Sequence, residues 1–146
     1  MSDIIDSLKR LERAGSENSK TTQKLIAAAT ELSNLIVEQF AVIGSEGVPV
    51  VSLCSKTVYD DNEERFRQVG RDFRYGISKG RLYNSGRRNS PFVDETRDDA
   101  LAFSKDIADG LLDHIIEALE KRAGENAEGL ATIEGAVAKL QATRKQ

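Results

Sequence analysis

The chain has 146 residues, of which 31% are charged and 39% are hydrophobic, and its 21 basic and 24 acidic residues give a net charge of -3. This length corresponds to one domain, and we expect residues 1–146 to form a single helical domain. The composition excludes a collagen-like chain and a disulfide scaffold. No apolar run reaches the roughly 18 residues that a membrane span needs, so we expect no membrane partner.

The single cysteine, Cys54, cannot form a disulfide within the chain, which suits a reducing compartment such as the cytosol. The first fifteen residues also lack the unbroken apolar stretch of a secretory signal. We therefore expect a cytoplasmic protein. Cys54 follows a short apolar run, residues 48–53, and is expected to be buried as a small hydrophobic side chain rather than to act as a nucleophile.

Two helices are predicted in the N-terminal part of the chain. Residues 3–13 carry apolar side chains at helical spacing, and residues 15–18 predict a break after them. A longer apolar stripe, sustained for six turns, predicts a second helix over about 19–43, which Gly44 and Gly47 end. The apolar positions of the first helix are Ile4, Ile5, Leu8 and Leu11.

Two further helices are predicted in the C-terminal part. The first begins either at Ser90-Pro91 or at Thr96, where Asp99 completes a capping-box pattern, and runs to about Arg122. Gly124 is expected to separate it from the last helix. That helix spaces its apolar residues by three, four and three, like a coiled-coil seam. The seam consists of Leu130, Ile133, Val137 and Leu140.

The seam bears on assembly. It spans too few heptads to be stable alone, so it packs either on the rest of a monomeric bundle or on a second copy of the chain. We expect a homo-oligomer, in which a terminal helix packs on its twin.

Residues 44–93 differ from both flanks because they hold both prolines and six of the eleven glycines. Val48 to Leu53 is predicted as a strand, and Tyr75 to Tyr83 as a hairpin that turns at Lys79-Gly80. Asp60 to Glu63 is predicted to open a helix that runs to about Tyr75. The expected fold is therefore mainly α: a bundle of about four to five helices with a central insertion, residues 44–93, that is irregular and rich in glycine and arginine.

Residues 65–88, the arginine segment, concentrate positive charge. They hold eight basic residues and a single acid, Asp72, and they include seven of the twelve arginines and four of the eight aromatic residues. Guanidinium groups bind phosphate or carboxylate oxygens two at a time and stack on flat rings. If residues 61–75 are helical, Arg67, Arg71 and Arg74 lie on one stripe, and Phe66 and Phe73 anchor the helix on the next.

This segment predicts a nucleic-acid binding protein whose arginines contact the phosphates of RNA or single-stranded DNA. Tyr75 and Tyr83 would stack on unpaired bases. The predicted binding residues are Arg65, Arg67, Arg71, Arg74, Lys79, Arg81, Arg87, Arg88, Tyr75 and Tyr83.

Two alternatives stay open. The chain could be a structural or assembly subunit, such as a helical nucleoprotein, a coat-like protein or an adaptor. Its arginines would then pair with the acidic residues that follow the segment, either within the chain or as an acidic protein surface on the helices of a neighbouring subunit. These acids are Asp94, Glu95, Asp98, Asp99, Asp106, Asp109 and Asp113. The segment could also bind a small phosphorylated ligand.

No catalytic residue, metal site or cofactor is predicted. His114 is the only histidine, so the ligand set of a zinc site is lacking. Residues 76–80 place a lysine among glycines, but not in the order of a phosphate-binding loop. We expect no enzymatic activity.

Overall fold

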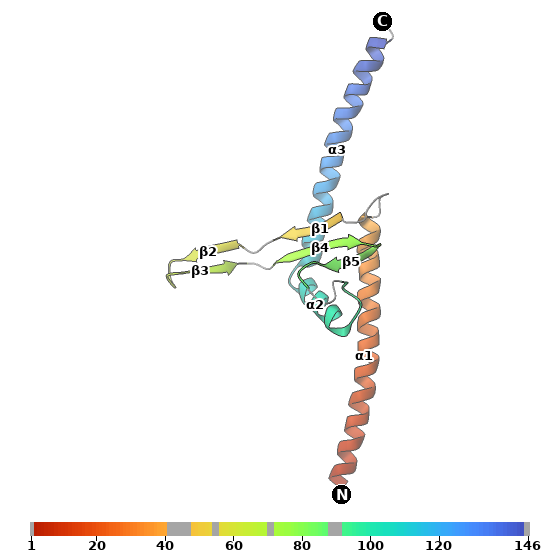
Figure 1. Cartoon of the computed structure of the whole chain (residues 1–146), viewed down its shortest axis with the longest axis vertical. Coiled ribbons are helices and arrows are strands. Elements are labelled where there is room, and N and C mark those ends of the chain that lie inside the picture. Colours follow the sequence, from red (N-terminus) through yellow and green to blue (C-terminus); the bar gives the residue numbers. More distant parts are fainter. Residues whose placement is uncertain (1, 41–47, 54–55, 70–71, 88–91, 145–146) are drawn as a thin grey trace. The chain divides into compact units, whose positions relative to one another are not determined.

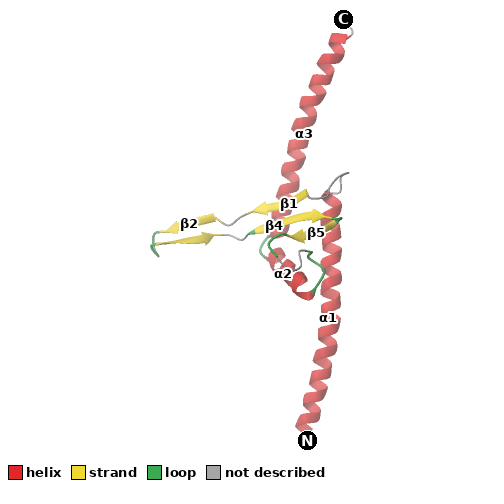
Figure 2. Cartoon of the chain, viewed as in Figure 1, coloured by secondary structure: helices red, strands yellow, loops and turns green. Residues whose placement is uncertain are grey.

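The computed structural model describes residues 2–40, 48–53, 56–69, 72–87 and 92–144. Helix is the commonest secondary structure among them, as expected, but a bundle of four to five helices is wrong (Figures 1 and 2). The described residues form three helices and five strands: α1 (Ser2–Phe40), β1 (Val48–Leu53), β2 (Lys56–Asp60), β3 (Arg65–Val69), β4 (Phe73–Ser78), β5 (Arg81–Asn84), α2 (Arg97–Ala108) and α3 (Leu111–Arg144).

The chain divides into two compact units. The first, Met1–Leu111, holds α1, α2 and all five strands, and we call it the folded unit. The second, Leu112–Gln146, is formed by α3, and we call it the helical unit.

Helix α1 is continuous over 39 residues, where the sequence predicts two helices. Residues 15–18 do not break it, because one glycine inside a helix costs only about 1 kcal/mol relative to alanine. In its C-terminal half, four buried side chains recur at helical spacing, and this half packs against α2 and β5. These side chains are Ala29, Ser33, Ile36 and Phe40.

The central segment is a set of strands rather than an irregular insertion. β1, β4 and β5 form an antiparallel sheet in the order β1-β4-β5, so the predicted strand 48–53 and the predicted hairpin 75–83 are confirmed. Lys79 and Gly80 at the turn have φ values of 55° and 69°. Positive φ at both central residues gives the turn the twist that flanking strands need.

One face of this sheet forms the core of the folded unit. Phe73, Tyr75 and Ile77 of β4 and Leu82 of β5 are at most 3% exposed. Helix α2 lies on this face, since the Phe103 ring is 6.1 Å from the Tyr75 ring. The remaining buried apolar side chains of the folded unit are Ala29, Ile36, Phe40, Val50, Val51, Val93, Ala100, Phe103 and Leu111.

β2 and β3 form a separate antiparallel hairpin, which lies beyond the ends of β1 and β4 in Figure 1. The helix predicted to run from Asp60 to Tyr75 is therefore wrong. The backbone of residues 65–69 pairs with β2 in an antiparallel register, with Phe66 opposite Tyr59, and these cross-strand pairs outweigh the apparent helix cap. Tyr59 and Phe66 are paired across the hairpin, with ring centroids 5.0 Å apart.

Helix α2 begins after Thr96, which is one of the two predicted starts. Thr96 is its N-cap: its side chain accepts a hydrogen bond from the Asp99 backbone amide at 3.2 Å, and the Asp99 carboxylate accepts one from the Thr96 amide at 3.2 Å. This capping box confirms the predicted pattern, while Ser90 and Pro91 lie outside the described residues. The helix does not continue to Arg122, because it ends at Ala108 and Gly110 follows with a φ of 101°.

Helix α3 runs unbroken from Leu111 to Arg144, so the predicted separation at Gly124 is also wrong. Gly124, Gly129 and Gly135 all lie within it. None of the helices described here is long and apolar enough to cross a membrane.

Candidate functional site

The arginine segment is spread over three strands and their connections. Arg65 and Arg67 lie in β3, Arg74 and Tyr75 in β4, and Arg81 and Tyr83 in β5. Lys79 lies in the β4–β5 turn and Arg87 follows β5, while Arg71, Arg88 and Cys54 lie outside the described residues. The predicted helical stripe of arginines does not exist, since side chains of a strand alternate between its two faces.

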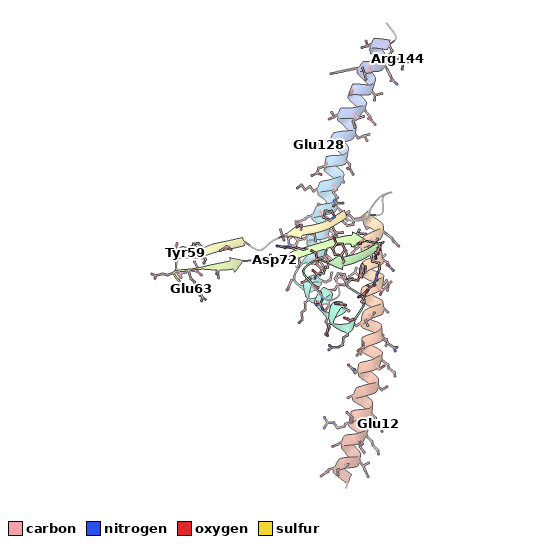
Figure 3. All side chains as sticks on the ribbon, in the orientation of Figure 1. Glu12, Tyr59, Glu63, Asp72, Glu128 and Arg144 are labelled. Carbon is pink, nitrogen blue, oxygen red and sulfur yellow. The ribbon has the colours of Figure 1, made fainter. Side chains whose placement is uncertain are left out.

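The β2–β3 hairpin is not a basic ribbon. Arg65 pairs with Glu63 (Nη2 to Oε2, 2.8 Å) and Arg67 with Asp60 (Nε to Oδ2, 3.6 Å). Figure 3 shows Tyr59 and Glu63 on this hairpin. Residues 56–69 hold three basic and four acidic side chains, so a phosphate approaching the hairpin meets at least as much negative as positive charge.

Arg81 binds carboxylates of the same chain. Its Nη2 lies 2.9 Å from Oδ1 of Asp94, and its Nη1 lies 3.4 Å from Oε1 of Glu95. Its guanidinium carbon also lies 4.0 Å from the centre of the Phe92 ring. The residues before α2 are thereby held against β5.

Arg87 binds the start of α2. Its Nε lies 3.0 Å from Oδ1 of Asp99, whose side chain is completely buried. The expected pairing between arginines and the acids that follow them is thus present within the chain at two positions, Arg81 and Arg87. Asp98 pairs with Arg97, outside the arginine segment (3.3 Å).

Tyr75 is part of the core and not a stacking platform for bases. Its side chain is 3% exposed, and its hydroxyl donates a hydrogen bond to the Asp106 carboxylate. The side-chain amide of Asn84 donates to the same hydroxyl at 3.3 Å. Asp106 is therefore a hydrogen-bond acceptor within the core of its own chain.

The other face of the three-stranded sheet carries the exposed members of the segment. Tyr83 is half-buried and crosses this face over Gly76, where an added Cβ atom would lie 2.6 Å from the Tyr83 hydroxyl oxygen. Arg74 is exposed beside it and is paired in register with Ser52 of β1. Together they border a hollow of about 190 Å³, which Pro49 and Ser85 also line.

A second hollow, of about 440 Å³, lies between the arginine segment and α2. Arg74 and Arg87 line it together with Asp72 and Asp106. Two cations and two carboxylates leave no excess of positive charge, so this lining does not favour a small phosphorylated ligand.

Most of the large apolar side chains that are exposed lie on α1 and α3. Leu130, Ile133, Val137 and Leu140 of α3 are exposed by 58%, 65%, 46% and 67%. Four apolar side chains near the start of α1 are exposed by at least half: Ile4, Ile5, Leu8 and Leu11. Both sets were recognised from the sequence, and side chains three and four residues apart share one face of a helix.

Sequence reasoning missed other members of the helical surface. Ile116 is 49% exposed on α3 and lies fourteen residues before Leu130, that is, two heptads earlier. The helix end predicted at Gly124 separates Ile116 from the seam, and the continuous α3 places them on one helix.

Among the described residues, no group of three or more histidine, cysteine, aspartate or glutamate side chains could hold a metal ion. No family model matches the chain, and no match was found among the curated proteins or the solved structures.

Proposed function

We propose that the protein is a non-enzymatic assembly subunit that associates with further copies of itself through the helical unit. The observation that carries this proposal is the exposed apolar seam of α3, Leu130 to Leu140. Single exposed apolar residues are ordinary, but contiguous apolar patches mark interaction surfaces. Each square ångström of apolar surface removed from water contributes about 25 cal/mol to association.

The arrangement of the arginines supports an assembly protein over a dedicated nucleic-acid binder. Arg81 and Arg87 each contact a carboxylate that is mostly or completely buried, so they stabilise the folded unit. Three of the ten residues predicted to bind nucleic acid, Arg81, Arg87 and Tyr75, thus have a structural role in the folded unit.

The seam is tested by placing charge on it. Changing Ile133 and Val137 together to aspartate buries two carboxylates in any helix pair formed through the seam, and we expect this variant to be a 16.0 kDa monomer. The wild-type chain is expected to have a larger mass. Light scattering during gel filtration measures both masses.

The control for this experiment adds the same charges elsewhere on the helix. Changing Ala131 and Ala138 to aspartate places two acids on exposed positions of α3 that lie outside the seam. This variant should keep the mass of the wild type. Equal masses for the seam variant and the wild type would refute self-association through this face.

A second candidate function is favoured by the face of the sheet that carries Arg74 and Tyr83. Arg74 and Tyr83 line one hollow there, a cation beside an aromatic ring, and such a pair can take a phosphate and a base of single-stranded RNA or DNA. Lys79 is exposed at the adjacent turn. We propose weak, salt-sensitive binding of single strands to this face.

Contact of Arg74 and Lys79 with two phosphates predicts that log K falls by about 1.4 for each tenfold rise in salt. Changing both residues to glutamine should lower the affinity and flatten this slope. The matched variant with glutamine at Lys9 and Lys24 of α1 should bind as the wild type does. Fluorescence anisotropy of a labelled oligonucleotide gives both quantities, and a wild-type chain that shows no binding at low salt would eliminate this candidate.

A further inference from the structure

The two long helices carry exposed apolar stripes with the same spacing. On α1, Ile4, Leu8 and Leu11 are more than half exposed, and their heptad positions continue at residues 15, 18, 22 and 25. On α3, the seam continues back through residues 126, 123 and 119 to Ile116, because the helix is unbroken. Contiguous exposed apolar side chains mark an interaction surface, so each stripe calls for a partner from outside the chain.

We infer that the seam of α3 packs antiparallel on the N-terminal half of α1 of a second copy, with Leu130 opposite Leu11. This inference rests on the proposed self-association and names the surface that the seam contacts. The contact is reciprocal, since α3 of each copy lies on α1 of the other, and such a two-fold arrangement closes a dimer. It covers both stripes of both copies, whereas pairing of α3 with α3 leaves the stripe of α1 exposed.

The spacing of the two stripes agrees in this orientation. Read forward from residue 4, α1 steps by four, three, four, three, four and three residues, and α3 takes the same steps when it is read backward from residue 137. These layers span about three heptads, which is long enough for a helix pair. Thr22 and Leu25, in the last two layers, line an open hollow of about 490 Å³ that leaves room for side chains of α3. The apolar layers pair Ile4 with Val137, Leu8 with Ile133, Leu11 with Leu130 and Leu25 with Ile116.

The middle of the helix pair gives Gly15 a role. No other part of the described chain lies within 4 Å of a Cβ atom added at Gly15, and a glycine inside a helix costs about 1 kcal/mol relative to alanine. The register sets Asn126 opposite Gly15 and Ala123 opposite Asn18, so each amide faces a small residue. The two asparagines lie in neighbouring layers, where their side-chain amides can hydrogen-bond to each other. Gly15 thus makes room for the amide of the second copy.

Charged side chains beside the stripes favour the same pairing. The register brings Lys9 beside Glu134 and Glu17 beside Arg122, each pair offset by two residues, or about 3 Å, along the helix axes. Residues 9–24 of α1 hold five basic and two acidic side chains, and the opposing residues 117–132 of α3 hold four acidic and two basic ones. Helices in a pair lie about 8–10 Å apart, close to the Debye length at physiological salt, so these charges attract. Pairing of α3 with α3 through residues 117–132 brings acidic side chains together instead.

A parallel pairing of the same two helices fits less well. Placing Leu11 beside Leu140 leaves only four residues of α3 before its end at Arg144, so the pair spans about two heptads. A longer parallel overlap sets Val137 opposite Ala29, which is 7% exposed because α2 packs there. The registers between these two set an asparagine of one helix opposite an apolar side chain of the other.

Disulfide trapping on the whole chain tests both the partner and the orientation. Cys54 is first changed to serine, and Leu11→Cys, Leu130→Cys and Leu140→Cys are then made in separate chains. Pairs of variants are unfolded together in urea, refolded as a mixture and oxidised. A disulfide requires Cα atoms about 4.4–6.8 Å apart. Positions 130 and 140 are separated by about 15 Å of helix, so residue 11 links to only one of them.

We expect the mixture of Leu11→Cys with Leu130→Cys to shift from 16.0 kDa to twice that mass on a denaturing gel without reductant. Peptide mass should identify the disulfide between residues 11 and 130. The control mixture of Leu11→Cys with Leu140→Cys, and each variant alone, should stay at 16.0 kDa. Linkage of residue 11 to residue 140 would establish the parallel arrangement, and linkage of residue 130 to itself would establish pairing of α3 with α3. Either result overturns the inference.

A chain that carries both Leu11→Cys and Leu130→Cys tests whether the partner is a second copy. Reciprocal pairing links two chains, so this variant should form a covalent dimer, and an internal disulfide in a 16.0 kDa chain would overturn the inference. An oligomer by light scattering that gives no disulfide in any sample would overturn this register. A wild-type chain that is a 16.0 kDa monomer by light scattering would overturn the proposed function itself.

Discussion

Replacing Phe73 by alanine is expected to lower the free energy of unfolding of the folded unit by about 3–5 kcal/mol, because the substitution leaves a cavity. Phe73 is 1% exposed in β4, inside the core. The same change at Phe66 is expected to cost at most about 1 kcal/mol, the value of one cross-strand aromatic contact. Phe66 is 71% exposed on the hairpin, where it contacts only the Tyr59 ring in the described aromatic pairs.

The two phenylalanines make a matched pair, because each lies in a strand of the arginine segment. Urea unfolding followed by circular dichroism, at one protein concentration, gives both values. In a helix over residues 61–75 the two rings would share one buried stripe, and both substitutions would be costly. Equal losses at Phe66 and Phe73 would therefore contradict the observed strands.

Asp99→Ala is expected to lower the free energy of unfolding by about 3 kcal/mol. The Asp99 side chain is completely buried, accepts a hydrogen bond at the N-terminus of α2, and pairs with Arg87 at 3.0 Å. Loss of an N-cap interaction costs about 1 kcal/mol, and loss of one partner of a buried ion pair costs up to 3–5 kcal/mol. Arg87 is one-third exposed, so water recovers part of that second cost.

Asp99→Asn is the control, because it keeps the size and one acceptor oxygen for the cap while removing the charge. Its loss should be smaller than that of the alanine variant. Combining Asp99→Ala with Arg87→Met should cost less than the sum of the two single changes, since the methionine variant leaves no unpaired guanidinium. Additive losses would show that the ion pair does not couple Arg87 to α2.

Local signals predicted several elements correctly. The apolar, β-branched run of β1, the Lys79-Gly80 turn and the Thr96 to Asp99 capping box each depend on contacts within a few residues, so the sequence alone specifies them. The spacing of the α3 seam was predicted for the same reason, because heptad spacing is a local pattern, but its exposure was not.

Predictions that relied on glycine as a helix end failed. Gly15 and Gly124 lie inside long helices, where each costs about 1 kcal/mol, and the many hydrogen bonds of an uninterrupted helix offset that cost. Conversely, the break between α2 and α3 falls at Gly110, whose positive φ was not apparent from the sequence.

The site was predicted in composition but not in geometry. Which arginines meet carboxylates depends on strand order: β5 brings Arg81 to Asp94, and the chain after β5 brings Arg87 to Asp99. No local pattern shows that Tyr75 is buried and Tyr83 is half-buried, since this follows from which face of the sheet α2 covers.

Sedimentation equilibrium of the intact wild-type chain, over loading concentrations from about 1 to 100 µM, tests the central claim most directly. Association through α3 predicts a weight-average mass that rises with concentration toward twice 16.0 kDa. The Ile133→Asp/Val137→Asp variant should stay at 16.0 kDa throughout. A wild-type mass of 16.0 kDa at every concentration would contradict the account.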